Sequence, residues 1–141
     1  MNKQQQLSNA ILTKISTLVW TNKPFVNAFD YFTLSNTWYP FICFECVWFE
    51  ANILDTCNNK RDYIYRMLIV QDYQTDRQDA YQRVSKAMSD VIDLFDEDYT
   101  LWLSEVRTTP MTWSIEWIQT EAGKAIVAEI ALRCQTINYI N

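Results

Sequence analysis

The segment Phe41-Ile-Cys-Phe-Glu-Cys-Val-Trp-Phe49 lies in the longest apolar-rich run of the chain, and Glu45 is its one charged residue. Successive side chains of a strand point to opposite faces, so a strand over residues 38–54 would be apolar on both faces. One expected face holds Phe41, Cys43, Val47 and Phe49, and the other holds Ile42, Phe44, Cys46 and Trp48. Because such a strand needs cover on both faces, we expect a second subunit or a partner to supply part of it.

The chain returns from this strand through a polar turn over residues 55–60 into a second strand over residues 61–73, so the two predict a long hairpin. The odd positions of the second strand form one face, which holds Tyr63, Tyr65, Met67 and Ile69. Glu45 and Glu50 are candidate functional carboxylates, because burial would shift their pKa values. The alternatives are an ion pair between Glu45 and Arg66 across the hairpin, or exposure near a sheet edge.

Two segments have the apolar spacing of amphipathic helices. The first covers residues 4–20 and ends before Pro24, which cannot continue the hydrogen-bond ladder. Its apolar stripe consists of Leu7, Ile11, Ile15 and Leu18. The second covers residues 75–95 and begins with Thr75-Asp-Arg-Gln78, which has the pattern of a capping box. Between the first helix and the apolar strand, residues 25–32 predict a weaker strand.

A second hairpin is predicted near the C-terminus, where residues 111–120 alternate and residues 125–137 return after a turn at Gly123. The apolar face of the first strand holds Met111, Trp113, Ile115 and Trp117, and that of the second holds Ile126, Ala128, Ile130, Leu132 and Cys134. The order α-β-β-β-α-β-β predicts one α+β domain over residues 1–141. We expect an antiparallel sheet of four to five strands with two amphipathic helices on it.

The composition excludes several classes of site. The 141 residues contain no histidine, which excludes histidine-dependent nucleophiles and histidine-ligated metals. The single glycine, Gly123, excludes glycine-rich phosphate loops. A net charge of −5 without a basic run lacks the electrostatic footprint of a nucleic-acid-binding protein. We therefore expect neither catalysis nor a cofactor.

Three further features carry simple interpretations. Cys43 and Cys46 form a CxxC pair, but positions three apart on a strand face opposite ways, which favours core thiols over a redox or metal site. The acidic residues of segment 90–98 favour a solvated or electrostatic contact surface over a metal site. No stretch is apolar enough to span a bilayer and no secretory signal is evident, so we expect no membrane contact and a cytosolic setting.

Aromatic residues mark the candidate contact surface. Trp113 and Trp117 share one face of their strand, where they are expected in the core, in a subunit interface or in a platform for a ligand. The residues that we expect at a subunit or partner interface are Trp48, Asp55, Asn58, Asn59, Lys60, Trp113 and Trp117.

The order of these elements resembles that of the tail terminator, or tail completion, proteins of long-tailed bacteriophages. The resemblance covers nearly the whole chain and rests on pattern and order. Its matching stretches are Leu7–Trp20, Tyr39-Pro40 with Phe41–Leu54, Arg61–Tyr73, Ala80–Phe95 and Trp113–Cys134. The acidic segment and the six tryptophans are departures from that pattern.

The resemblance implies a structural virion protein that assembles into a ring, with a hexamer expected. Such a ring caps the tail tube at the tail–neck junction, joins it to the head connector and lets DNA pass. Its partners would be copies of itself, the major tail tube protein and the neck proteins, and assembly would occur in the host cytoplasm. The alternatives are another neck or head-completion component, a small intracellular α+β interaction domain, and a small enzyme that uses carboxylates such as Glu45, Glu50 and Asp93.

Overall fold

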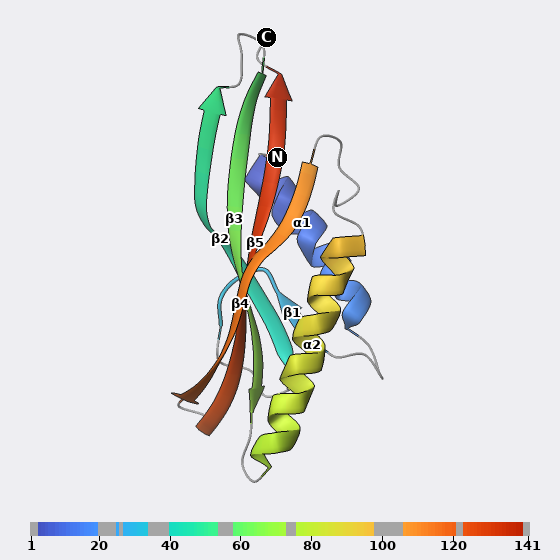
Figure 1. Cartoon of the computed structure of the whole chain (residues 1–141), viewed down its shortest axis with the longest axis vertical. Helices are drawn as coiled ribbons and strands as arrows, with labels where there is room; N and C mark the ends of the chain where they lie inside the picture. The colour runs from blue at the N-terminus through green and yellow to red at the C-terminus, as the bar shows by residue number, and fades with distance from the viewer. Residues whose placement is uncertain are drawn as a thin grey trace.

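The computed structural model describes residues 3–19, 25, 27–33, 40–53, 58–72, 76–97, 106–120 and 123–139. The elements are α1 (Lys3–Ile15), a 3-10 turn (Ser16–Leu18), β1 (Asn27–Phe29), β2 (Phe41–Ile53), β3 (Asn58–Asp72), α2 (Arg77–Glu97), β4 (Val106–Thr120) and β5 (Gly123–Tyr139). The strands form one sheet in the order β1-β2-β3-β5-β4 (Figure 1). The predicted α+β class and the order of the elements are confirmed.

The sheet is mixed, so the expectation of a wholly antiparallel sheet is wrong at one edge. β1 pairs with β2 in parallel, with Asn27 opposite Phe41, whereas the pairs β2–β3, β3–β5 and β4–β5 are antiparallel. Parallel neighbours need a connection long enough to bring the chain back to the same end. The segment between Phe29 and Phe41 provides that length.

Three strands start earlier than the sequence predicts, and one of them is β5, which begins at Gly123 instead of residue 125. β3 begins at Asn58, inside the expected polar turn, because residues 58–60 pair with β5 and residues 59–60 also pair with β2. These ladder hydrogen bonds outweigh the low strand propensity of asparagine. β4 begins at Val106 instead of residue 111, and a bulge between Pro110 and Thr112 accommodates the proline in this edge strand.

Both helices lie on the same face of the sheet (Figure 1). Their buried faces meet the predicted inward residues of β3 and β5 in the main core. From α1 these are Leu7, Ile11 and Ile15, and from α2 they are Ala80, Val84, Ala87, Val91 and Phe95. Thr75, which begins the predicted capping box, lies outside the described residues. At the start of α2 the Asp79 backbone N–H donates to Asp76 Oδ1 at 3.0 Å, because a short carboxylate at this position reaches the free N–H groups of the first turn.

At the start of β2, the chain itself covers the face that points away from the helices. Phe41 and Cys43 are fully buried in a second core with Val70, Ala125 and Val127. Residues 27–33 supply the cover: the rings of Phe29 and Phe41 lie 5.8 Å apart, and Cys43 Sγ donates to the carbonyl oxygen of Thr33 at 3.6 Å.

A bulge in β2 changes the predicted alternation. The register shifts between Cys46 and Trp48, so Cys46 lies opposite Tyr65 but Trp48 lies opposite Ile64, the next residue along β3. Because neighbouring residues of β3 face opposite ways, Trp48 lies on the face away from the helices. The prediction that Trp48 shares a face with Ile42, Phe44 and Cys46 is therefore wrong.

Candidate functional site

The sheet face away from the helices is the candidate contact surface, and we call it the open face. Strand register assigns to it the even-numbered residues of β3 and the odd-numbered residues of β5. One end, at Phe41, Val70 and Val127, is apolar and covered by residues 27–33. The other end carries the exposed ring of Trp48 and the half-buried side chain of Arg133.

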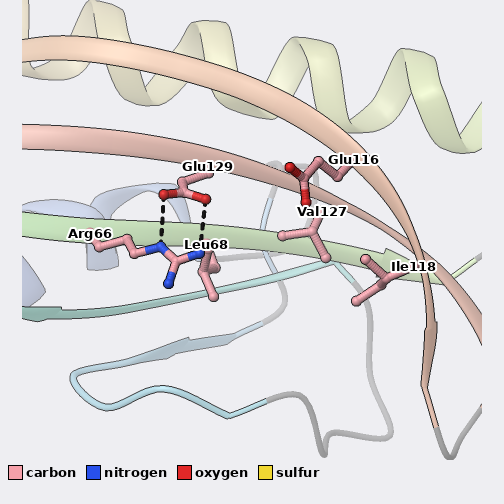
Figure 2. Close-up of a pocket in the computed structure, with 6 residues that line it drawn as sticks. All are labelled: Arg66, Leu68, Glu116, Ile118, Val127 and Glu129. Carbon is pink, nitrogen blue, oxygen red and sulfur yellow. Dashed lines mark hydrogen bonds and ion pairs between the residues drawn. The ribbon is translucent and has the colours of Figure 1, made fainter.

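Arg66 and Glu129 form the principal polar contact of the open face. Arg66 Nε and Nη2 donate to the two carboxylate oxygens of Glu129 at 2.7 and 2.9 Å (Figure 2). This paired hydrogen bond raises the pKa of Arg66 above its ordinary value. Both side chains are more than a third exposed, so solvent screening keeps the contribution of the pair to stability small.

The proposed pairing of Glu45 with Arg66 is half right. The two residues are opposite each other in the β2–β3 ladder, as the hairpin requires. Arg66 forms its ion pair with Glu129, however, and Glu45 Oε1 accepts a hydrogen bond from the backbone N–H of Phe32 at 2.8 Å. The carboxylate of Glu45 thus ties residues 27–33 to the sheet, which is a structural task.

A shallow depression lies in the middle of the open face, with a volume of about 150 Å³. Six residues line it (Figure 2): Arg66, Leu68, Glu116, Ile118, Val127 and Glu129. Leu68, Ile118 and Val127 make an apolar floor, and one cation and two carboxylates form the rim. Sites for metabolites and cofactors usually measure about 300–1,000 Å³, so this depression is better suited to one side chain of a partner.

Val47 and Trp48 are adjacent exposed apolar residues of β2, and we call them the bulge patch. Their exposed fractions are 48% and 64%. On β3 and β5, Asp62 Oδ1 and Arg133 Nε are buried polar atoms without a hydrogen-bond partner. Unpaired buried polar atoms cost free energy, so this part of the sheet carries a local cost.

The other candidate interface residues are dispersed. Trp117 lies opposite Ile126 on the helix-covered face, half-buried under Arg77, whose guanidinium is 3.9 Å from the ring centroid. Trp113 is paired with Ile130 in the β4–β5 ladder, and its side chain lies outside the description. The backbones of Asn58, Asn59 and Lys60 belong to β3, while their side chains lie outside the description and Asp55 lies outside the described residues. Trp48 is thus the exposed member of the predicted set whose side chain the structure describes on the open face.

The cysteines with described side chains are free thiols. Cys43 and Cys46 face opposite sides of β2, as predicted, and burial raises the pKa of Cys43, Cys46 and Cys134 above the ordinary thiol value. A raised pKa suppresses the reactive thiolate. Across the described ranges, no group of three or more acidic or cysteine side chains is placed to hold a metal ion. In the same ranges, no helix has the length and apolar character to cross a membrane.

Two features were missed in the sequence. Lys14 is 1% exposed, with its ammonium 5.6 Å from the centroid of the Phe95 ring. Its spacing from Leu7, Ile11 and Leu18 places it on the apolar stripe, so periodicity was a signal for its burial. No pattern in the sequence indicated the ion pair of Arg66 with Glu129. The two residues meet because β3 and β5 are neighbouring strands, and this depends on the order of the strands in the sheet.

Comparison with protein-family models finds no match to this chain, and no curated protein matches its sequence.

Proposed function

We propose that the chain is a structural subunit that assembles with copies of itself into a ring, and that the ring acts as a phage tail terminator. The resemblance in element order supports the phage part of this proposal. The observation that carries the assembly part is the exposure of the bulge patch and of the edges of the sheet.

The two edges of the sheet have long lengths of backbone beside which the described residues place no further strand. β1 pairs with residues 41–43 of β2, and among the described segments no strand lies beside the outer edge of β2 from Phe44 to Ile53. β4 is the opposite edge strand, over Val106–Thr120. Free edges invite strand addition by other chains, and bulges reduce this tendency. The bulge of β2 is at Val47 and the bulge of β4 is at Met111. Both residues have exposed apolar side chains.

A ring of identical subunits would cover such surfaces, because each copy presents one surface and receives another. By the resemblance, one end of the ring would meet the major tail tube protein and the other the head connector. The net charge of −5 is compatible with DNA that passes through the ring without sequence-specific binding.

The test has two parts. Light scattering of the purified full chain should give a mass several times that of one copy, and labelled protein should bind at the ends of isolated tail tubes. A monomer that binds no tube would overturn the proposal. Assembly into a ring that binds elsewhere in the neck would favour another neck component, and a monomer that binds an intracellular partner would favour an interaction domain.

A further inference from the structure

We propose that the bulge patch of one copy docks into the depression of the next copy, with the Trp48 indole as the inserted group. This inference rests on the proposed self-assembly and names the surfaces that meet. It requires that the two surfaces fit in size, in polar groups and in charge.

The size of the depression suits one large side chain. Its volume is about 150 Å³, and its floor consists of Leu68, Ile118 and Val127. Trp48 is 64% exposed, so most of an aromatic surface of about 150–250 Å² remains to be buried. Large aromatic side chains that fill pockets dominate the affinity of protein interfaces.

The rim supplies the polar groups that a buried indole needs. The indole Nε1–H can only donate a hydrogen bond. The carboxylates of Glu116 and Glu129, which lie beside the apolar floor, can accept it (Figure 2). Arg66 adds a cation that can lie on an aromatic face, as it already does at Phe32, 5.9 Å from the ring centroid.

The Arg133 guanidinium carries a charge opposite to that of the two carboxylates on the rim, and Asp62 lies on the same face as Arg133. Arg133 lies in the same cross-strand row as Trp48 and Ile64, two strands away from Trp48. In the docked arrangement this guanidinium approaches the two carboxylates on the rim of the neighbouring depression. Such charge pairs orient the partner and set its register.

A second copy is the occupant that we propose, because this chain itself supplies both the exposed indole and a depression with an apolar floor and carboxylate rim, and the patch cannot reach the depression of its own chain. Trp48 lies opposite Ile64, and the first floor residue, Leu68, is four positions further along β3, or about 13 Å at the usual rise per residue. A surface that inserts into a different surface of the next copy makes a head-to-tail contact. Contacts of that type close into rings when the rotation between copies allows it.

The first experiment measures assembly by sedimentation velocity of the full chain and two variants. Trp48→Ala should weaken self-association by about thirty-fold or more, as expected for an aromatic hot spot. Tyr81→Ala is the matched control, because Tyr81 is an exposed aromatic residue on α2 and should leave association unchanged. Circular dichroism of each variant verifies that it is folded.

The second experiment is a cross-link between copies in which Trp48 is kept. Val47→Cys and Ile118→Cys proteins, each also carrying Cys57→Ser, are mixed and oxidised. A disulfide-linked dimer should form in the mixture and not when Tyr81→Cys replaces Val47→Cys. If wild-type protein assembles but Trp48→Ala assembles equally well and no cross-link forms, the docking inference is wrong and the proposed ring stands. If wild-type protein is a monomer, both are wrong.

Discussion

Replacement of Tyr65 by phenylalanine removes a single hydroxyl group that joins the sheet to α1. Tyr65 is fully buried, and its hydroxyl donates to the carbonyl oxygen of Gln4 at 2.9 Å. The same hydroxyl lies 2.8 Å from Ser8 Oγ, and with its hydrogen directed at Gln4 it accepts from that serine. Both contacts link residues about sixty positions apart, so they hold α1 against the sheet.

The expected loss follows from these two bonds. A neutral hydrogen bond contributes about 0.5–1.5 kcal/mol net, so Tyr65→Phe should lower the free energy of unfolding by about 1.5 kcal/mol. For a chain of this length that corresponds to a fall in Tm of about 4–6 °C. Ser8→Ala should cost less, about 0.5 kcal/mol, because Ser8 is half-exposed and its hydroxyl can bind water.

The assay is urea unfolding of wild type, both single variants and the double variant. Because Ser8 and Tyr65 are in contact, the double variant should lose about 0.5 kcal/mol less than the sum of the single losses. Tyr81→Phe is the control, since the Tyr81 side chain is 48% exposed and should unfold like wild type. A loss below about 0.3 kcal/mol for Tyr65→Phe would refute the described anchoring of α1.

Three further variants test other parts of the structure by the same unfolding assay. Asp76→Ala should lower the free energy of unfolding by about 1 kcal/mol because it removes the cap of α2, whereas Gln78→Ala should lower it by less than 0.5 kcal/mol. Equal losses would favour the predicted capping box over the Asp76 cap. Glu129→Gln should cost less than about 1 kcal/mol, and a loss above 2 kcal/mol would contradict the exposed ion pair. Burial raises the pKa of Cys134, so the buried neutral thiol contributes to the stability of the fold. This contribution is complete below the thiol pKa in the unfolded chain, about 8.5, and is lost as pH rises. Between pH 9 and 11, Cys134→Ala should therefore reduce the fall of stability with pH by about 1.4 kcal/mol per unit, and an unchanged slope would contradict the raised pKa.

Local patterns in the sequence predicted much of the fold. The spacing of Leu7, Ile11 and Ile15 located α1, and the alternation of residues 126–134 identified the buried face of β5, since burial on one face imposes these periods. Positions that depend on the neighbouring strand were not predictable in this way. Asn58 belongs to β3 because β5 pairs with it there, which no local propensity indicates.

The candidate site was less accessible to sequence reasoning. Trp48 was named as an interface residue, but one extra residue in β2 moves it to the other face, and a bulge has no pattern of its own here. The depression joins Arg66 of β3 to Glu129 of β5 and Glu116 of β4. Its existence depends on the order of three strands, which a single sequence does not reveal.

The mass of the full chain in solution tests the central claim most directly. One copy has a mass of 16.8 kDa, and sedimentation velocity over a range of micromolar concentrations should show a closed assembly at a multiple of that mass. Six copies are the expected number, and the Trp48→Ala variant should shift the distribution toward 16.8 kDa. A single species of 16.8 kDa for wild type at every concentration would contradict the account.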